Sequence, residues 1–326
     1  MLSRNAQGLY WIGRYLERAQ HGCRLLIDQL ETLKDRSVEE IELSWRRLYG
    51  ALGRVPLGGQ LGSNLGDDWF MLADAYTLAD DLTFEADNPD AVRSCLGTAR
   101  ENARQVRNTI NKDLWTCLNL LFLGMRELSI EDIWQDRPAE FYQSTENAIR
   151  TFAGVADSTM YRDESWHFLQ LGRFVERTQL LADLIDAQLA TFPAGEQPTE
   201  SDWLSLLRIC GARVAYGRLF SLQVRPSLVV GFLVTDPLFS RSIRFGLGVI
   251  SDALGVFSAG RPLTLEAGRR AGRLVARIDC EWPNHDLEDE DTTRALLQQV
   301  GQSSRLLHDD IRVAYFDYEI EDVPQS

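Results

Sequence analysis

The sequence predicts an all-α protein, a bundle of long helices built from a tandem-duplicated helical unit. Apolar residues recur at intervals of three and four along most of the chain, which places them on one face of an α-helix. The stripe on the first helix occurs a second time, 159 positions later. No two alternating apolar segments are joined by a hairpin turn, so the sequence gives no sign of a β-sheet.

The first helix begins near Ser3 or Asn5, because either side chain can cap a helix N-terminus. Its apolar stripe consists of Leu9, Ile12, Leu16, Ala19, Cys23, Leu26, Leu30 and Leu33. The matching stripe consists of Phe168, Leu171, Val175, Thr178, Ala182, Ile185, Leu189 and Phe192. Proline and glycine follow at Pro193 and Gly195, and they predict the end of the second long helix.

Other landmarks repeat in the same order. The matched pairs are Trp45-x-x-Leu48 with Trp203-x-x-Leu206, and Asn88-Pro89-x-x-x-Arg93-Ser94 with Asp236-Pro237-x-x-x-Arg241-Ser242. Asn-Pro and Asp-Pro steps are typical of turns at which proline opens a new helix. These landmarks predict internal repeats of about 1–158 and 159–326, merged into a single domain that spans 1–326.

Between the landmarks, helical periodicity predicts further helices at about 39–52, 67–86, 89–128, 139–157, 202–222, 227–234, 238–257, 264–281 and 291–320. Segments rich in glycine, proline or acidic residues predict loops at 53–66, 193–199, 258–262 and 283–291.

Composition excludes several classes of function. The chain has 34 basic and 48 acidic residues, and its net charge of −14 argues against nucleic acid or an anionic membrane as partner. Only Lys34 and Lys112 are lysines, so P-loop or Schiff-base chemistry is not indicated. The five cysteines contain no Cys-x-x-Cys pair. With no signal peptide and no membrane-length apolar segment, a cytoplasmic location is expected.

Each long helix carries the motif Gly-Arg-x-x-Glu-Arg on the face opposite its stripe, at Gly13–Arg18 and at Gly172–Arg177. Charges three and four positions apart on a helix are neighbours. Tyr10, Trp11 and His21 lie on the same side of the first helix, which indicates a second protein interface on that face. The two motif glycines cost about 1 kcal/mol each relative to alanine, which indicates close approach of another backbone.

Two interpretations of the motif remain open, and both can hold. The structural one is a partly buried ion-pair network that locks each long helix to its neighbours. The functional one is an arginine-lined pocket for a carboxylate or phosphate, because arginine binds such anions with two parallel hydrogen bonds. The candidate residues for either role are Arg14, Glu17, Arg18, Arg173, Glu176, Arg177, Arg93 and Arg241.

We expect no metal and no cofactor. Glu164-x-x-His167 has the spacing of a di-iron ligand pair, but Asn5 and Gly8 stand at the matching places of the first repeat. The acidic run at 283–291 lacks the ligand spacing of a calcium-binding EF-hand. No glycine-rich nucleotide motif or nucleophile elbow occurs.

The opening Leu2-Ser3-Arg4-x-Ala6-x-x-Leu9-Tyr10-Trp11-Ile12-Gly13-Arg14-Tyr15-x-Glu17-Arg18 resembles the signature of the alpha-E family, helical proteins of uncharacterised activity named for a Glu-Arg motif. The second motif and the Asp-Pro segment are similar to that family too. The resemblance implies a partner, since such proteins are typically encoded beside, or fused to, circularly permuted ATP-grasp proteins. It implies peptide modification by ATP-dependent amide ligation, and it carries over no catalytic residue.

The first functional hypothesis is therefore a helical partner or co-catalytic subunit of an ATP-grasp-type amide or peptide ligase. It would hold a carboxylate or peptide substrate with the paired Glu-Arg motifs. The alternatives are an autonomous transferase- or ligase-like enzyme with an Arg-Glu pocket, and a purely structural helical scaffold. The sequence does not decide whether the chain is itself an enzyme.

Overall fold

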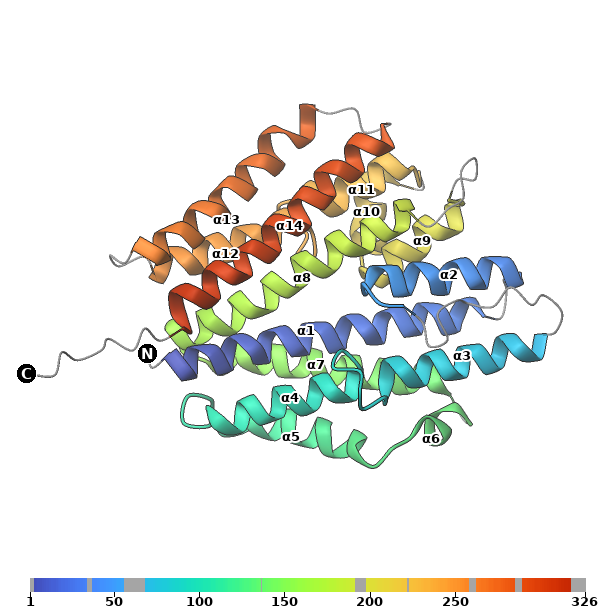
Figure 1. The fold of residues 1–326 in the computed structure, drawn as a ribbon, viewed down its shortest axis with the longest axis horizontal. Coiled ribbons are helices and arrows are strands. Elements are labelled where there is room, and N and C mark those ends of the chain that lie inside the picture. Colours follow the sequence, from blue (N-terminus) through green and yellow to red (C-terminus); the bar gives the residue numbers. More distant parts are fainter. Residues whose placement is uncertain are drawn as a thin grey trace, which may run out of the picture.

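Two long helices, α1 (Ser3–Thr32) and α8 (Glu164–Ala190), run side by side through the centre of the molecule (Figure 1). The computed structural model describes residues 3–33, 37–55, 68–135, 137–190, 198–221, 223–257, 262–284 and 289–317. These segments contain fourteen α-helices and no β-strand, which confirms the all-α prediction. None of the described helices is long and apolar enough to cross a membrane.

The other helices surround this central pair. Those between α1 and α8 are α2 (Val38–Ala51), α3 (Asp68–Thr83), α4 (Val92–Gln105), α5 (Lys112–Arg126), α6 (Ile130–Trp134) and α7 (Pro138–Thr159). Those after α8 are α9 (Glu200–Ile209), α10 (Arg213–Phe220), α11 (Pro226–Thr235), α12 (Ile243–Phe257), α13 (Pro262–Cys280) and α14 (Glu290–Tyr315), with a short 3-10 turn at Trp282–Asn284.

The packing forms two groups of four helices. Helix α1 packs against α4 and α7, and α5 joins those two helices on the far side from α1. Helix α8 packs in the same manner against α12 and α14, which α13 joins. Two further helices connect the groups: α2, which follows α1, packs on α8, and α9, which follows α8, contacts α1. The apolar stripes face these neighbours, and most of their residues are buried.

Two of the predicted long helices are each divided into two helices in the structure. The single helix predicted at 89–128 is wrong: α4 ends at Gln105, and Asn111 starts α5 by accepting a hydrogen bond from the Leu114 backbone N–H at 2.9 Å. The helix predicted at 202–222 is divided at Gly211, whose φ of +60° ends α9 in the left-handed conformation that glycine adopts readily. The predicted loops at 53–66, 193–199 and 258–262 lie largely outside the described residues. The loop predicted at 283–291 is too long, because a 3-10 turn includes residues 283 and 284 and α14 begins at Glu290.

The two motif glycines lie where α1 and α8 cross. A Cβ atom on Gly13 would lie 2.7 Å from the backbone nitrogen of Arg173, and one on Gly172 would lie 2.7 Å from the carbonyl carbon of Tyr10. The expected close approach of another backbone is therefore confirmed at both glycines, and each helix is the other's neighbour. The crossing brings the charged residues that follow each glycine against the opposite helix.

We predict that Gly172→Ala lowers the free energy of unfolding by about 2 kcal/mol or more, because the added methyl group overlaps backbone that cannot move aside. The matched control is Gly154→Ala in α7, where a Cβ meets nothing within 4 Å. That change should stabilise the chain by up to about 1 kcal/mol, since alanine favours a helix. Urea unfolding measures both, and equal behaviour of the two variants would contradict the crossing.

Candidate functional site

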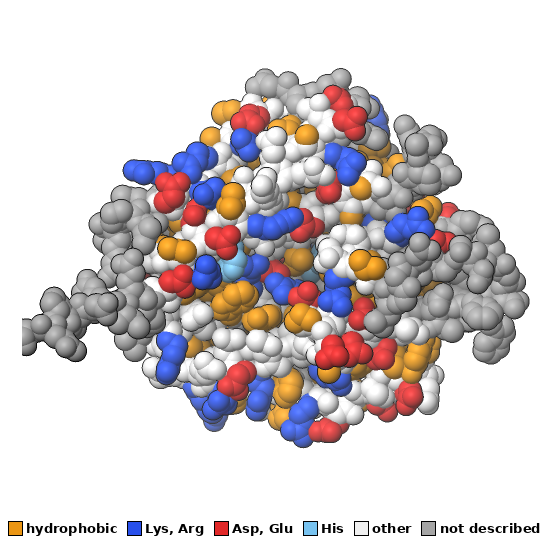
Figure 2. Space-filling view, in the orientation of Figure 1, with side chains coloured by type: hydrophobic (Ala, Val, Ile, Leu, Met, Phe, Trp, Pro, Cys, Tyr) orange, Lys and Arg blue, Asp and Glu red, His pale blue; other side chains and the backbone are white. Residues whose placement is uncertain are grey.

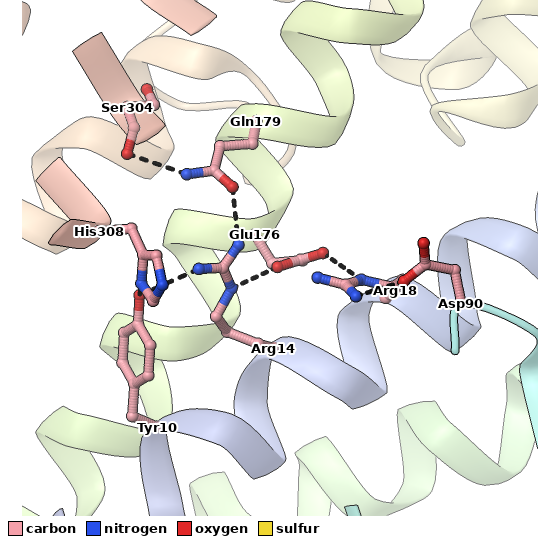
Figure 3. Close-up of polar contacts among 8 residues, drawn as sticks. All are labelled: Tyr10, Arg14, Arg18, Asp90, Glu176, Gln179, Ser304 and His308. Carbon is pink, nitrogen blue, oxygen red and sulfur yellow. Dashed lines mark hydrogen bonds and ion pairs between the residues drawn. The ribbon is translucent and has the colours of Figure 1, made fainter. Parts of the chain in front are cut away.

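The Glu176 cluster consists of Glu176 with Arg14 and Arg18, its two partners from α1 (Figure 3). The Nε of Arg14 donates to one carboxylate oxygen of Glu176, and the Nε of Arg18 donates to the other at 2.7 Å. Arg18 also donates to Asp90 in the turn before α4. Glu176 is only 2% exposed and Arg14 only 5%. This carboxylate therefore has both oxygens occupied inside the protein.

Additional polar groups close the remaining side of Arg14 (Figure 3). Its Nη2 donates to the Gln179 side-chain oxygen at 2.7 Å, and Gln179 in turn donates to the backbone carbonyl of Ser304 in α14 at 2.9 Å. The hydroxyl of Tyr10 lies 3.5 Å from Arg14 Nη1 and 2.8 Å from Nδ1 of His308. With these contacts each terminal nitrogen of Arg14 has a protein acceptor.

The Glu17 cluster consists of Glu17 with Arg173 and Arg177, its two partners from α8. Nε and Nη2 of Arg177 donate to the two carboxylate oxygens of Glu17, each at 2.6 Å, in the paired geometry that arginine and carboxylate favour. The remaining Nη1 of Arg177 donates to the backbone carbonyl of Ser240 at 2.9 Å. Arg173 makes a longer contact, 3.5 Å from its Nε to Glu17, and its side chain is 25% exposed.

The pairing is reciprocal. Each glutamate of one motif binds both arginines of the other motif, so ion pairs run in both directions between α1 and α8 at the crossing. The structure thus brings six of the eight predicted candidates together at one place. Arg93 lies apart from them, with its guanidinium donating to the backbone carbonyls of Phe84 and Leu128. Arg241 lies in the turn before α12 and shares a cavity with Glu17 and Arg177.

Opposed effects of burial and ion pairing set the ionisation of these groups. Burial alone would raise the pKa of Glu17, but the Arg177 charge and hydrogen bonds, with Arg173 and Arg24 nearby, lower that pKa from 4.5 to about 2. Burial likewise opposes ionisation of Glu176, yet Arg14 and Arg18 hold its pKa below the ordinary value. Both carboxylates are therefore charged at neutral pH.

Two histidines beside the clusters are neutral at pH 7. Burial and the nearby Arg24 charge lower the pKa of His21 to about 4. Burial and the Arg14 charge lower the pKa of His308 to about 4 as well. A neutral imidazole offers one donor and one acceptor, and in His308 the Nδ1 atom can accept from the Tyr10 hydroxyl.

Sequence reasoning missed a second set of buried charges that extends the network along α1. Arg24 donates from its Nε to Glu146 of α7, and Asp28 accepts from the Nε of Arg208 in α9 at 2.9 Å. A signal for the α1 members existed: Arg14, Glu17, His21, Arg24 and Asp28 follow the 3-4 spacing of a second, polar stripe. Gln179 lies one turn after Glu176 on α8, whereas no comparable pattern marks Glu146 or His308.

Two small cavities adjoin the Glu17 cluster. The first, here called the apolar cavity, lies between α1, α7 and α8 beside Arg173, with mainly aliphatic and aromatic side chains around it. The second, the arginine cavity, lies between α1, α8, the end of α9 and the turn before α12. Its polar lining consists of Glu17, His21, Arg24, Arg177 and Arg241, and leucines of α8 line much of the rest.

The chemistry available at these cavities is anion binding more than nucleophilic catalysis. Burial raises the pKa values of the Cys23, Cys95 and Cys210 thiols, which keeps them protonated. Among the described residues, no three His, Cys, Asp or Glu side chains converge as metal ligands would. On the face of the molecule shown in Figure 2, basic and acidic side chains are interspersed, and side chains of both charges lie close together near the middle of this face.

A model of the Alpha-E family, a predicted alpha-helical domain with a conserved ER motif, matches residues 1–316. Uncharacterized protein Mb2597 of Mycobacterium bovis and uncharacterized protein Rv2567 of Mycobacterium tuberculosis are each 27% identical to the chain over 277 residues. These matches cover 78% of this chain but 30% of each relative, so the chain spans less than a third of the length of these curated relatives. No solved structure matches the chain.

We predict that Glu176→Gln lowers the free energy of unfolding by about 3 kcal/mol, because it leaves the buried Arg14 without a countercharge. The matched control is Glu42→Gln, since Glu42 pairs with Arg46 on an exposed face of α2. The Glu42→Gln change should lower the free energy of unfolding by about 0.5 kcal/mol. Urea unfolding at pH 7 compares the two, and a small effect of Glu176→Gln would show that the Glu176 cluster is not needed to hold the helices together.

The Glu17 cluster predicts an acid-sensitive component of stability. Because the folded-state pKa of Glu17 is about 2 against an ordinary 4.5, the unfolded chain takes up this proton first. The contribution is therefore complete above about pH 4.5 and is lost as the pH falls toward 2. Glu17→Gln should be less stable than the wild type at pH 7, with a difference that shrinks on acidification. Unfolding curves measured across this range test it, and a constant difference would contradict the assignment.

Proposed function

The chain belongs to the Alpha-E family, and we propose from this membership and from the Glu17 and Glu176 clusters that it is the helical partner of an ATP-grasp-type amide or peptide ligase. In this proposal the ligase supplies the nucleotide chemistry. The present chain supplies a rigid docking body and a place beside the Glu17 cluster where a substrate carboxylate is held.

The observation that carries the proposal is the difference between the two clusters. The Glu176 cluster is closed, because Arg14 has an acceptor for each terminal nitrogen and the carboxylate accepts on both oxygens. The Glu17 cluster adjoins two cavities, and Arg173 makes only a long contact with its glutamate. One copy of the motif thus acts as a structural lock, and the other leaves cationic groups beside space for a ligand.

The lengths of the relatives support a partner. In the mycobacterial proteins the matched segment makes up 30% of a longer polypeptide. Membership of a longer polypeptide in these relatives supports a unit that works beside another domain or protein. The packing supports a second element of the proposal, the tandem duplication, because α1 with α4, α5 and α7 matches α8 with α12, α13 and α14 in order of contact.

The two alternatives have less support. A purely structural scaffold requires no space beside the motif arginines, whereas cavities adjoin both Arg173 and Arg177. An autonomous transferase or ligase requires an activated nucleophile or its own nucleotide site. The buried thiols are protonated, and the sequence contains no glycine-rich phosphate loop.

We predict that the chain co-elutes in size-exclusion chromatography with an ATP-grasp protein encoded beside it, when the two are co-expressed and applied at micromolar concentration. The matched control is the same ligase co-expressed with an unrelated helical protein of similar size. Separate elution would overturn the stable-partner proposal.

The same preparation distinguishes the ligase-partner hypothesis from the autonomous-enzyme hypothesis. Incubation with ATP and a candidate peptide should give an amide product only when the ligase is present, and the yield should rise when the present chain is added. Product formed by the present chain alone would favour the autonomous enzyme.

A further inference from the structure

The arginine cavity contains buried hydrogen-bond donors that the ion-pair network does not use. Arg24 is 7% exposed, and its Nε donates to Glu146. Its Nη2 is buried and has no hydrogen-bond partner within the part of the chain that the structure describes. The Nε2 atom of His21, one helical turn earlier on α1, is also buried without a partner. Both residues line the cavity, and buried donors without acceptors are costly.

The charge around the cavity is also unbalanced. Its lining includes the arginines Arg24, Arg177 and Arg241 but a single carboxylate, Glu17, which Arg177 and Arg173 already occupy. Glu146 lies beyond the cavity wall and divides its charge between Arg24 and Arg150. Positive charge therefore remains in excess at this place, within a chain whose overall charge is −14. An anion in the cavity would restore the balance.

The remaining wall of the cavity is apolar, with Leu180, Leu181 and Leu184 of α8 on one side and the end of α9 on another. A compact, fully hydrated ion such as phosphate gains nothing from such a wall, whereas an aliphatic stem does. We propose that the arginine cavity binds a carboxylate attached to a short aliphatic group, with Arg24, Arg241 and His21 as its donors. The ligand is either a free branched-chain acid or the end of a peptide.

This site rests on the cavity and its unused donors, and it stands whether or not a ligase partner exists. Arg24 and Arg241 would donate charge-assisted hydrogen bonds to the carboxylate, and neutral His21 would donate from Nε2. His21 is surrounded by Arg24, Arg177, Arg241, Glu17 and, farther off, Glu176. Burial and the Arg24 charge keep this ring neutral, and a bound anion would offset the Arg24 charge, so the pKa of His21 should rise when the site is filled.

We predict that isovalerate binds the full chain with a dissociation constant of about 1 mM or tighter, measured by calorimetry at pH 7. Isovaleramide has the same shape without the charge and should not bind. Inorganic phosphate should bind more weakly than isovalerate. N-acetyl-leucine distinguishes the two sources of the carboxylate, because tighter binding than isovalerate identifies a peptide end and weaker binding identifies a free acid.

The variant that tests the site is Arg241→Gln, because Arg241 is not part of the ion pairs that join the two motifs. It should weaken isovalerate binding about tenfold or more while the melting temperature stays close to that of the wild type. The matched control is Arg244→Gln, three positions along, where the guanidinium pairs with Asp279 and does not line the cavity. That variant should bind isovalerate as the wild type does.

A second readout needs no variant of the site. The pKa of His21, followed by NMR in the wild-type chain, should rise when isovalerate is added and stay unchanged with isovaleramide. The proposal is overturned if isovalerate does not bind, if phosphate binds more tightly, if Arg241→Gln binds as the wild type does, or if the His21 pKa does not respond to isovalerate.

Discussion

The rest of the structure depends on the reciprocal ion pairs between α1 and α8, at the place where Gly13 and Gly172 let the two helices cross. Because Gly13 and Gly172 bring the two backbones into contact, the charged residues that follow them are forced against the opposite helix and lose their water. Burying an unpaired charge costs several kcal/mol, so each must meet a countercharge there. Glu17 and Glu176 meet this need reciprocally. The two groups of four helices are then assembled on either side of one fixed contact.

The two sets of ion pairs are chemically different although their motifs are the same. Tyr10, Gln179 and His308 complete the surroundings of Arg14, and these residues come from α1, α8 and α14. Around Glu17 the corresponding space is left to two cavities. One motif in two copies can therefore serve two purposes, since protein groups close one copy around Arg14 while the other copy adjoins two cavities. The two interpretations that the sequence left open can therefore both hold, one at each cluster.

Much of the fold could be predicted from periodicity, because a stripe on a long helix is a local property of the chain. The close backbone approach at Gly13 and Gly172 was predictable for the same reason, since glycine in a helix needs a packing explanation. The pairing was not predictable in detail. Arg14, Glu17 and Arg18 are neighbours on one helix, yet the ion pairs run between helices. Gln179 follows Glu176 by three positions on α8, but nothing in the sequence indicates that it binds Arg14 of the other helix. Glu146 and His308 are single residues distant in sequence, and no spacing rule connects them to the motif.

A buried ion-pair network is a weak source of net stability, because desolvation cancels much of the attraction between the charges. Its stronger effect is on register. If α1 slid along α8 by one helical turn, the glycines would no longer face backbone, and Arg14 would lose Glu176 and Gln179 together. Apolar side chains alone would tolerate such a shift far better, since their attraction has no direction. We infer that the paired motifs fix the position of one half of the molecule against the other, which is what a docking surface or a cavity formed between α1, α8 and α9 requires.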